Sequence, residues 1–318
     1  MNTKLQCDFC YHMCTLKEGQ RGVCGIRSNQ GGKLVSHGWA EVVASALEAV
    51  EKKPLYHFFP GSKTLSVALF GCNYRCKFCQ NYHISQGERP ERRSEKILPH
   101  KLAQTLKQSN SKILSFTYSE PVVWLDYVEE CATEVKKDNN FTCMITNGSF
   151  SKTSLNRILP LIDAFNIDLK GDDNFYREYC GGKLEPVLDS IETIAEAEGK
   201  VLEVTTLLIE EIHSARDVRQ MGRQLKERGV KVWHLSRFYP QYLMEDYHQT
   251  SEHYLERMLE EASLAGIPYI YAGNSNLTGW GDTKCPSCGA PLIARKRTAV
   301  KFNGNKCHAC GYEIYGRF

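Results

Sequence analysis

Apolar residues follow two different periods along the middle of this chain. Short apolar runs, typical of buried strands, alternate with longer segments in which apolar residues recur every three or four positions, as in amphipathic helices. The runs expected to form strands are 65–70, 113–118, 141–146, 164–169, 201–209, 232–238 and 269–272. The expected helices are 99–109, 122–137, 151–159, 188–199, 215–228 and 252–265.

A strand-then-helix alternation of this length indicates a parallel sheet with right-handed crossovers. We therefore predict an α/β protein with a full or partial (β/α) barrel over residues 51–280. A cysteine-rich segment over 1–50 precedes it, with a short strand or hairpin within 33–46, and a zinc-ribbon-like tail over 281–318 follows it. In such barrels the chemistry lies at the carboxyl ends of the strands.

Composition agrees with a globular protein, because 42% of the 318 residues are hydrophobic and can fill a sizeable core. The net charge is +3, and basic residues form only two short runs, 89–93 and 294–297. We expect these runs to be solvated faces and do not expect nucleic acid as a partner. No apolar run is long enough for a membrane span and no signal peptide is recognisable, so we expect a cytoplasmic protein.

Eleven of the fourteen cysteines fall into three groups with spacings typical of metal sites. In a reducing compartment such groups indicate metals rather than disulfides. The remaining three, Cys131, Cys143 and Cys180, stand alone in the sequence, and we expect them to be small buried hydrophobes.

The central group, Cys72, Cys76 and Cys79, follows the first expected barrel strand directly. Three thiolates this close can hold one iron–sulfur cluster and leave one iron without a protein ligand. Zinc prefers four ligands from paired knuckles, so this spacing is a poor zinc site. Reduced thiols in a tight loop are the other alternative.

The N-terminal group lies in a glycine-rich segment that is too short to bury a core of its own. Four thiols are the right number for tetrahedral zinc or for an iron–sulfur cluster, and the spacing leaves the metal open. The alternative is a lid packed on the barrel with no metal. The candidate ligands are Cys7, Cys10, Cys14 and Cys24.

The C-terminal group consists of two Cys-x2-Cys-Gly turns separated by eighteen residues. Paired turns of this kind are typical of zinc knuckles, and four thiolates close the coordination sphere, so we predict a structural zinc site. Rubredoxin-type iron is the alternative occupant. The predicted ligands are Cys285, Cys288, Cys307 and Cys310.

Polar side chains follow or end several of the expected strands, where barrels place their active sites. Together they offer a carboxylate for an ammonium group, hydroxyl and amide donors for a ribose and a carboxylate, and a lysine for negative charge. Ser119 and Asn147 could each be only a helix cap or a turn former, and we expect His57 to be a packed loop residue. The candidate cofactor-binding residues are Ser119, Glu120, Thr146, Asn147, Asp168, Lys170 and His234.

The central loop, Gly-Cys-Asn-x-x-Cys-x-Phe-Cys-Gln-Asn, resembles the cluster loop of radical S-adenosylmethionine (SAM) enzymes, in which the open iron of a [4Fe-4S] cluster chelates SAM. Ser119-Glu120-Pro121 is similar to the Gly-Gly-Glu-type motif, which implies that Glu120 binds the SAM amino group. Two strand ends, Thr146-Asn147-Gly148 and Asp168-Leu169-Lys170, resemble those of pyruvate formate-lyase activases. This likeness implies that Asp168 helps to hold a monovalent cation beside the SAM carboxylate, although Ile145 replaces a second cation-binding Asp.

Motifs along nearly the whole chain resemble the radical SAM member of the AmmeMemoRadiSam system. They include residues 18–27, 51–58, 71–81, 117–121 and 234–238, together with the cysteine-rich start. The resemblance implies a low-potential electron donor such as flavodoxin or ferredoxin, and Memo-like and AMMECR-like partner proteins. It implies an enzyme that abstracts hydrogen from a protein, peptide or small molecule. The alternative is an iron–sulfur and zinc redox or scaffold protein that does not cleave SAM.

Overall fold

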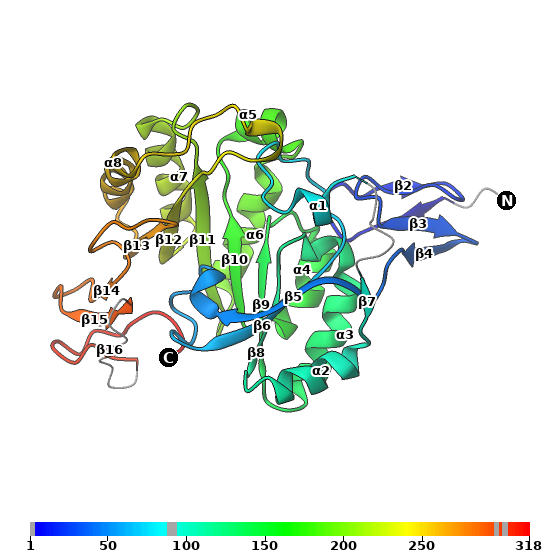
Figure 1. The fold of residues 1–318 in the computed structure, drawn as a ribbon, viewed down its shortest axis with the longest axis horizontal. Helices are drawn as coiled ribbons and strands as arrows, with labels where there is room; N and C mark the ends of the chain where they lie inside the picture. The colour runs from blue at the N-terminus through cyan, green and yellow to red at the C-terminus, as the bar shows by residue number, and fades with distance from the viewer. Residues whose placement is uncertain (1–3, 88–93, 296–298, 301–304) are drawn as a thin grey trace.

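A computed structural model of the chain describes residues 4–87, 94–295, 299–300 and 305–318. The basic run 89–93 lies outside these ranges, as do the last two residues of the run 294–297. At the centre is a nine-stranded sheet with the order β13-β12-β11-β10-β9-β8-β6-β5-β7 (Figure 1). Its strands are β5 (Glu41–Ala49), β6 (Lys63–Leu69), β7 (Glu95–Lys96), β8 (Ile113–Phe116), β9 (Phe141–Thr146), β10 (Ala164–Asp168), β11 (Val201–Leu208), β12 (Val232–Arg237) and β13 (Tyr269–Gly273).

The run from β6 through β8 to β13 is parallel, as the sequence alternation predicts. Strands β13 and β7 form the two edges, so the sheet curves without closing and is a partial barrel. The interior strands are buried along almost their whole length; every residue of β8 and β12, for example, is buried. Burial on both faces is expected for parallel strands covered by crossover helices.

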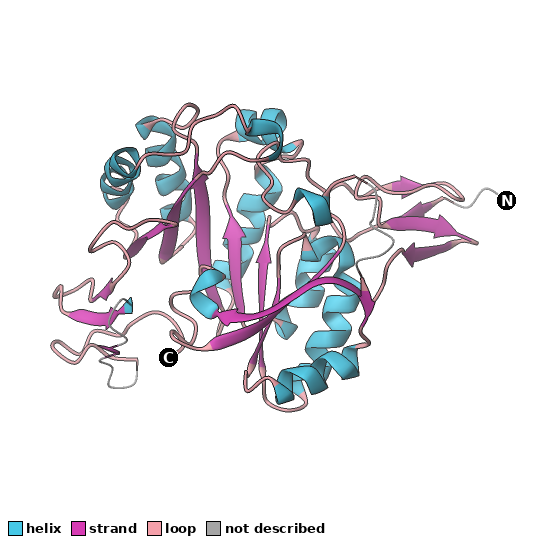
Figure 2. Ribbon diagram, in the orientation of Figure 1, coloured by secondary structure: helices cyan, strands magenta, loops and turns pink. Residues whose placement is uncertain are grey.

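The helices connect the parallel strands and pack against the sheet (Figure 2). Serine caps begin several of them: Ser151 forms a capping box with Ser154, and Ser214 forms one with Asp217. The α-helices are α1 (Tyr82–Ser85), α2 (Pro99–Gln108), α3 (Leu125–Lys136), α4 (Lys152–Ile158), α5 (Asp173–Phe175), α6 (Glu185–Glu196), α7 (Ala215–Glu227) and α8 (Glu252–Ser263). The shorter helices are η1 (Val50–Lys52), η2 (Pro121–Trp124), η3 (Leu159–Leu161), η4 (Tyr176–Cys180) and η5 (Tyr242–Met244).

Two helices differ most from the sequence prediction. The helix predicted over 122–137 is divided into the 3-10 turn η2 and helix α3, because Trp124 leaves helical geometry with φ −124° and ψ 37°. Helix α6 begins at Glu185, three residues before the predicted start, because a proline in the first turn is compatible with a helix and removes an amide that would lack a partner.

Strand β5 extends further than the sequence pattern indicates. The weak alternation of 33–46, expected to hold a short strand or hairpin, covers β4 (Lys33–Ser36), which pairs with β3 (Arg27–Gln30), and the start of β5. Strand β5 continues to Ala49 and pairs antiparallel with β6, so it extends the main sheet. The chain therefore joins the sheet at Glu41, whereas the sequence places the start of the barrel at residue 51.

The loop between β5 and β6 enters the partial barrel and contacts its inner strands. Asn166 on β10 donates a hydrogen bond to the carbonyl of Pro54 at 2.8 Å, and the amide of His57 donates to Glu203 on β11 at 2.7 Å. The His57 ring is fully buried and hydrogen-bonds the Tyr271 hydroxyl at 2.7 Å. His57 is thus the packed loop residue that the sequence predicts.

Two cysteine-rich regions lie at opposite ends of the view in Figure 1. We call residues 4–36 the N-terminal module; it contains the strands β1 (Leu5–Gln6) and β2 (Thr15–Leu16) and the β3–β4 hairpin. We call residues 281–318 the tail; it contains β14 (Thr283–Lys284), β15 (Pro291–Ala294) and β16 (Ala299–Val300). Among the described residues, no helix is both long enough and apolar enough to cross a membrane.

The described part of the second basic run is not a solvated face, which corrects the sequence expectation. Arg295 donates hydrogen bonds to the hydroxyl of Thr283 and to the carbonyl of Tyr56, both at 2.9 Å. Its guanidinium also lies 4.0 Å from the centre of the Tyr56 ring. A planar guanidinium suits this combination of stacking and hydrogen bonding, so Arg295 joins the tail to the barrel loop.

Candidate functional site

One cavity of about 800 Å³ lies at the carboxyl ends of the parallel strands. Its lining includes all three cysteines of the central loop and all seven side chains predicted to bind a cofactor. These residues come from five segments that are separated along the chain, and the parallel sheet brings them to one edge. The cavity is therefore the site at which the sequence-predicted chemistry converges.

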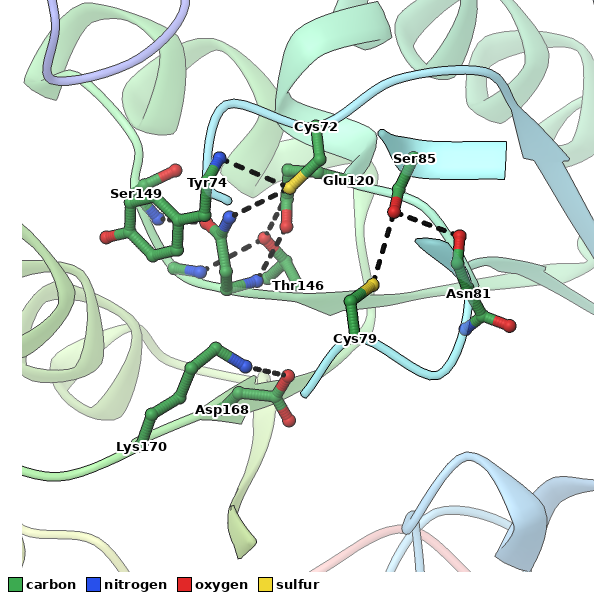
Figure 3. Close-up of polar contacts among 12 residues, drawn as sticks. Cys72, Tyr74, Cys79, Asn81, Ser85, Glu120, Thr146, Ser149, Asp168 and Lys170 are labelled. Carbon is green, nitrogen blue, oxygen red and sulfur yellow. Dashed lines mark hydrogen bonds and ion pairs between the residues drawn. The ribbon is translucent and has the colours of Figure 1, made fainter. Parts of the chain in front are cut away.

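The three cysteines belong to a loop that directly follows β6, residues 72–79, which we call the cluster loop. Cys76 is buried, and Cys72 and Cys79 are partly exposed. The amide of Tyr74 points to the Cys72 sulfur at 3.3 Å, and the Ser85 hydroxyl lies 3.2 Å from the Cys79 sulfur (Figure 3). Hydrogen bonds of this kind stabilise thiolates, which are the form of cysteine that binds metals.

The π-helical turn η4 holds the cluster loop from the opposite side. The amides of Arg75 and Lys77 donate to the carbonyls of Cys180 and Tyr179, both at 2.8 Å. Gly182 follows the turn and lies against the Tyr74 ring, where an added Cβ would come within 2.5 Å of a ring atom. Only glycine allows this close approach, so η4 fixes the path of the cluster loop.

Cys180 is buried, as the sequence predicts for an isolated cysteine, but its neighbour is a cysteine of the cluster loop. A hydrogen bond with Cys180, together with burial, raises the pKa of the Cys76 thiol. Cys180 is absent from the residues that line the cavity. The three thiols of the cluster loop, and not this fourth one, therefore face the space in which a ligand could bind.

Glu120 lies at the end of β8 with its carboxylate buried beside the cluster loop. It accepts hydrogen bonds from the Thr146 hydroxyl at 2.5 Å and from the amides of Asn147 at 2.7 Å and Val122 at 3.0 Å. Burial raises the pKa of the Glu120 carboxyl to about 7, although these hydrogen bonds act to lower it. A carboxylate offers about four acceptor sites, so Glu120 retains capacity for a ligand donor.

The side chain of Asn147 connects the strand ends to the cluster loop. Its amide nitrogen donates to the side-chain oxygen of Asn73 at 3.0 Å and lies 3.8 Å from the Cys72 sulfur. Asn73 in turn donates to the Ser149 hydroxyl at 2.7 Å. Sequence analysis did not single out Asn73, whose position directly after Cys72 is the only available signal.

Asp168 and Lys170 form an ion pair at the cavity edge, with 2.8 Å between the ammonium nitrogen and a carboxylate oxygen (Figure 3). The Lys170 side chain is mostly buried. The Tyr176 hydroxyl from η4 bridges the backbone here, because it donates to the carbonyl of Asp168 and accepts from the amide of Lys170, both at 3.1 Å. The pair places fixed charges of both signs near the cluster loop.

Ser119 and His234 line the cavity, but both already have protein partners. The Ser119 hydroxyl donates to the carbonyl of Leu69 and accepts from the indole nitrogen of Trp124 at 3.1 Å. His234 lies within β12, and its Nε2 contacts Glu203 on β11 at 2.7 Å. Both side chains therefore stabilise the fold, in addition to any contact that they make with a ligand.

The cavity lining also contains a charged group that the sequence did not reveal. The Lys53 ammonium lies 2.6 Å from the Glu48 carboxylate and 3.9 Å from the centre of the Tyr118 ring. The Tyr118 hydroxyl donates to the same carboxylate. These three residues are contributed by β5, the loop that enters the barrel and the end of β8, so only the fold brings them together.

The tail cysteines form a separate, tight group. The sulfurs of Cys285 and Cys310 lie 3.6 Å apart, those of Cys288 and Cys307 lie 3.7 Å apart, and all four lie within 4.8 Å of one another. Zinc–sulfur bonds of about 2.3 Å in a tetrahedron require sulfur separations of about 3.8 Å. Each knuckle also ends as predicted, in a glycine with positive φ. The four thiols could therefore hold one metal ion.

The N-terminal module packs directly on the cluster loop. The His12 ring lies 3.3 Å from the carbonyl of Asn73, and Arg75 donates to the carbonyl of Val23 at 2.9 Å. Both contacts lie close in sequence to cysteines of the module, since His12 is two residues after Cys10 and Val23 adjoins Cys24. The described residues thus include three groups of thiols, two of which are neighbours.

Comparison with known proteins agrees with this geometry. The family described as the Radical SAM superfamily matches residues 67–221, which include the cluster loop and the strand ends with Glu120 and Asp168. An uncharacterized protein of Methanocaldococcus jannaschii is 35% identical over 329 residues, covering 98% of this chain and 96% of that protein. A candidate glycyl-radical enzyme activating enzyme of the same organism is 26% identical over 171 residues, covering 52% of this chain and 63% of that protein.

The fold is also similar to that of a solved structure. Streptococcus suis SuiB bound to S-adenosylmethionine aligns with a TM-score of 0.53 at 12% sequence identity, covering 72% of this chain and 53% of that chain. The similarity confirms the α/β partial barrel. Since the matched family includes the cluster loop and the strand ends with Glu120 and Asp168, and a relative matches nearly end to end, the chain belongs to the radical SAM superfamily.

Proposed function

We propose that this protein binds a [4Fe-4S] cluster through Cys72, Cys76 and Cys79 and uses it to cleave SAM reductively. The observation that carries the proposal is that these three thiols and the strand-end polar side chains line one cavity. When bound, such a cluster supplies one electron to the SAM sulfonium, which yields methionine and a 5′-deoxyadenosyl radical that abstracts hydrogen from a substrate.

The donor set of the cluster loop fits a cluster with one open iron. Three thiols face the cavity, and the hydrogen bonds at Cys72 and Cys79 would stabilise their thiolate forms. Lys170 adds a positive charge near the loop, where the thiolates add negative charge. Cys180 lies outside the cavity lining and leaves the open side of the loop to the ligand.

The strand ends offer complementary groups for the amino acid part of SAM. Glu120 would bind the ammonium group, because its buried carboxylate retains acceptor capacity beside Cys72. Thr146 and Asn147 hold this carboxylate in place, so they position Glu120 as well as lining the cavity. The Asp168–Lys170 pair would orient the carboxylate end of SAM through the Lys170 charge.

The same cavity extends to a wall suited to a substrate. Glu48, Lys53 and Tyr118 present both charges and an aromatic face within the same cavity lining. The motif order along the chain supports membership of the AmmeMemoRadiSam system, and the candidate activating enzyme among its relatives supports chemistry of the activase type. The substrate class is then a protein, a peptide or a small molecule that enters the cavity.

Production of 5′-deoxyadenosine tests the proposal. Protein reconstituted anaerobically with iron and sulfide is reduced and mixed with SAM, and the product is measured by chromatography. We expect 5′-deoxyadenosine only when cluster, reductant and SAM are all present. A reduced, cluster-loaded protein that leaves SAM intact would support the redox or scaffold alternative instead.

The substrate can be identified with the same assay. Molecules that co-purify with the protein from its native host are prepared in deuterated form and added to the reaction. Transfer of deuterium to 5′-deoxyadenosine identifies a substrate, because the abstracted atom is retained in that product. A flavodoxin or a ferredoxin of the host should replace the chemical reductant.

A further inference from the structure

The four cysteines of the N-terminal module come from three adjoining segments. Cys7 and Cys14 follow and precede the paired strands β1 and β2, and the amide of Cys7 donates to the carbonyl of Cys14 at 2.9 Å. A Cβ added to Gly22 would lie 3.5 Å from the Cys14 sulfur, so the turn that carries Cys24 passes directly beside Cys14. The fold thus brings Cys7, Cys14 and the turn that carries Cys24 to one place.

The other two cysteines lie in tight turns of the same module. Cys10 lies in the turn between Cys7 and Cys14, where the amide of Met13 donates to the carbonyl of Cys10 at 3.1 Å. Cys24 lies in the turn that begins at Gly22, where the amide of Gly25 donates to the carbonyl of Gly22 at 2.9 Å.

The spacing of these thiols differs from that of the tail. Among the described residues that could ligate a metal, the tail cysteines are the one group whose ligand atoms all lie within 4.8 Å of one another. The N-terminal cysteines converge without reaching this separation, and so do the three cysteines of the cluster loop. A mononuclear zinc site needs the tighter arrangement, whereas a cluster of several irons needs a wider one.

The N-terminal cysteines also lie against the cluster loop. The ring of His12, two residues after Cys10, lies 3.3 Å from the carbonyl of Asn73, which adjoins Cys72 in sequence. The side chain of Ile26, two residues after Cys24, packs on Gly71, which directly precedes Cys72. A redox centre on these thiols would therefore lie beside the cluster loop.

We propose that Cys7, Cys10, Cys14 and Cys24 hold a second iron–sulfur cluster that passes electrons to the cluster loop. The inference rests on the proposed function, because it needs a cluster at Cys72, Cys76 and Cys79 as the acceptor. One electron moves from a reduced flavodoxin or ferredoxin to the N-terminal cluster and then to the cluster loop. The N-terminal cluster is reduced and reoxidised once in each cycle, and none of its bonds to the protein forms or breaks.

Metal content tests the site without requiring SAM chemistry. In the full-length triple variant Cys72→Ala, Cys76→Ala, Cys79→Ala, reconstituted anaerobically, we expect iron with an equal amount of acid-labile sulfide and a visible charge-transfer absorbance. Adding Cys14→Ser and Cys24→Ser to this variant should remove the remaining iron. Zinc alone at the N-terminal cysteines, or no metal there, would overturn the inference. Mössbauer counting of two clusters in the unaltered protein provides the same test if the triple variant does not fold.

The source of electrons tests the relay. For the variant Cys14→Ser, Cys24→Ser, the rate of 5′-deoxyadenosine formation with reduced flavodoxin is divided by the rate with dithionite, which reaches both sites directly. We expect this ratio to fall strongly relative to the unaltered protein and to the control Cys131→Ala. An unchanged ratio would show that electrons enter elsewhere and would overturn the relay. Failure of the proposed function is distinguished by loss of both rates in the unaltered protein.

Discussion

Three thiols of the cluster loop line the central cavity, whereas four thiols of the tail surround a single point away from it. The tail sulfurs approach to 3.6 and 3.7 Å and occupy every position of a tetrahedral ion. The cluster loop is spaced more widely and leaves one side to Glu120 and Asn147. Ligand number and spacing therefore distinguish a closed four-thiol site from a three-thiol site whose open side can bind a reactant.

Removal of one cluster-loop thiol should have the largest effect. We expect Cys76→Ala to abolish SAM cleavage, because the cluster loses one of three protein ligands. The measurement is 5′-deoxyadenosine formation together with the visible absorbance of this site. Cys131→Ala, which removes a buried thiol from α3, is the matched control and should retain activity. Retained SAM cleavage in Cys76→Ala would refute the assignment of the cluster loop.

Removal of tail thiols should affect metal content without removing the cluster. We expect about one zinc per chain in the unaltered protein and none in Cys288→Ser, Cys310→Ser, measured by elemental analysis. The tail should then lose its fold, because small metal modules depend on their metal. The cluster-loop absorbance should persist. If the variant keeps its zinc, or if the native tail contains redox-active iron, the tail is not a closed structural site.

Replacing Glu120 should have an intermediate effect, and it tests whether the open side of the cluster loop binds SAM. Glu120→Gln keeps the side-chain shape and removes the charge, so a charge-assisted contact of about 1.5–3 kcal/mol is weakened. We expect the SAM dissociation constant to rise about 10- to 100-fold in anaerobic titration calorimetry, with the cluster intact. Unchanged SAM affinity would mean that the carboxylate serves only Thr146 and Asn147.

The smallest expected effect is on pH dependence. Burial raises the pKa of the Glu120 carboxyl to about 7, so the group becomes protonated as the pH falls through this value. The SAM ammonium requires the ionised carboxylate, and its affinity should therefore decrease by up to about tenfold for each pH unit below 7. The same titration of Glu120→Gln should show a flat profile over this range. Parallel profiles for both proteins would contradict the assignment.

The sequence predicted the parallel core well because that core depends on local patterns. The strand β9 and the helices α2 and α7, for example, follow the predicted runs closely, since apolar period, serine caps and Pro99 act within a few residues. The three cysteine groups were equally visible, because their ligands lie close together in sequence. The pairing of β5 with β6 was not visible, since it depends on contacts between strands rather than on the weak alternation of 33–46.

The environment of the site was less predictable, because it depends on contacts between distant segments. Cys180 stands alone in the sequence, and only the hydrogen bonds between η4 and the cluster loop bring it to Cys76. Sequence could list Ser119 and His234 as cofactor candidates but could not show that Trp124 and Glu203 already contact them. The Lys53–Glu48 pair was missed for the same reason.

The loop that enters the barrel has a consequence for the order of folding. The His57 ring is hydrogen-bonded to the carbonyl of Tyr315 at 2.6 Å, across a sequence separation of 258 residues. Closing so long a span costs chain entropy that local contacts must offset first, and contacts of this kind form late. The cysteines of the cluster loop can therefore come together before this contact forms. The docking of the tail on the loop between β5 and β6 would then be among the last steps of folding.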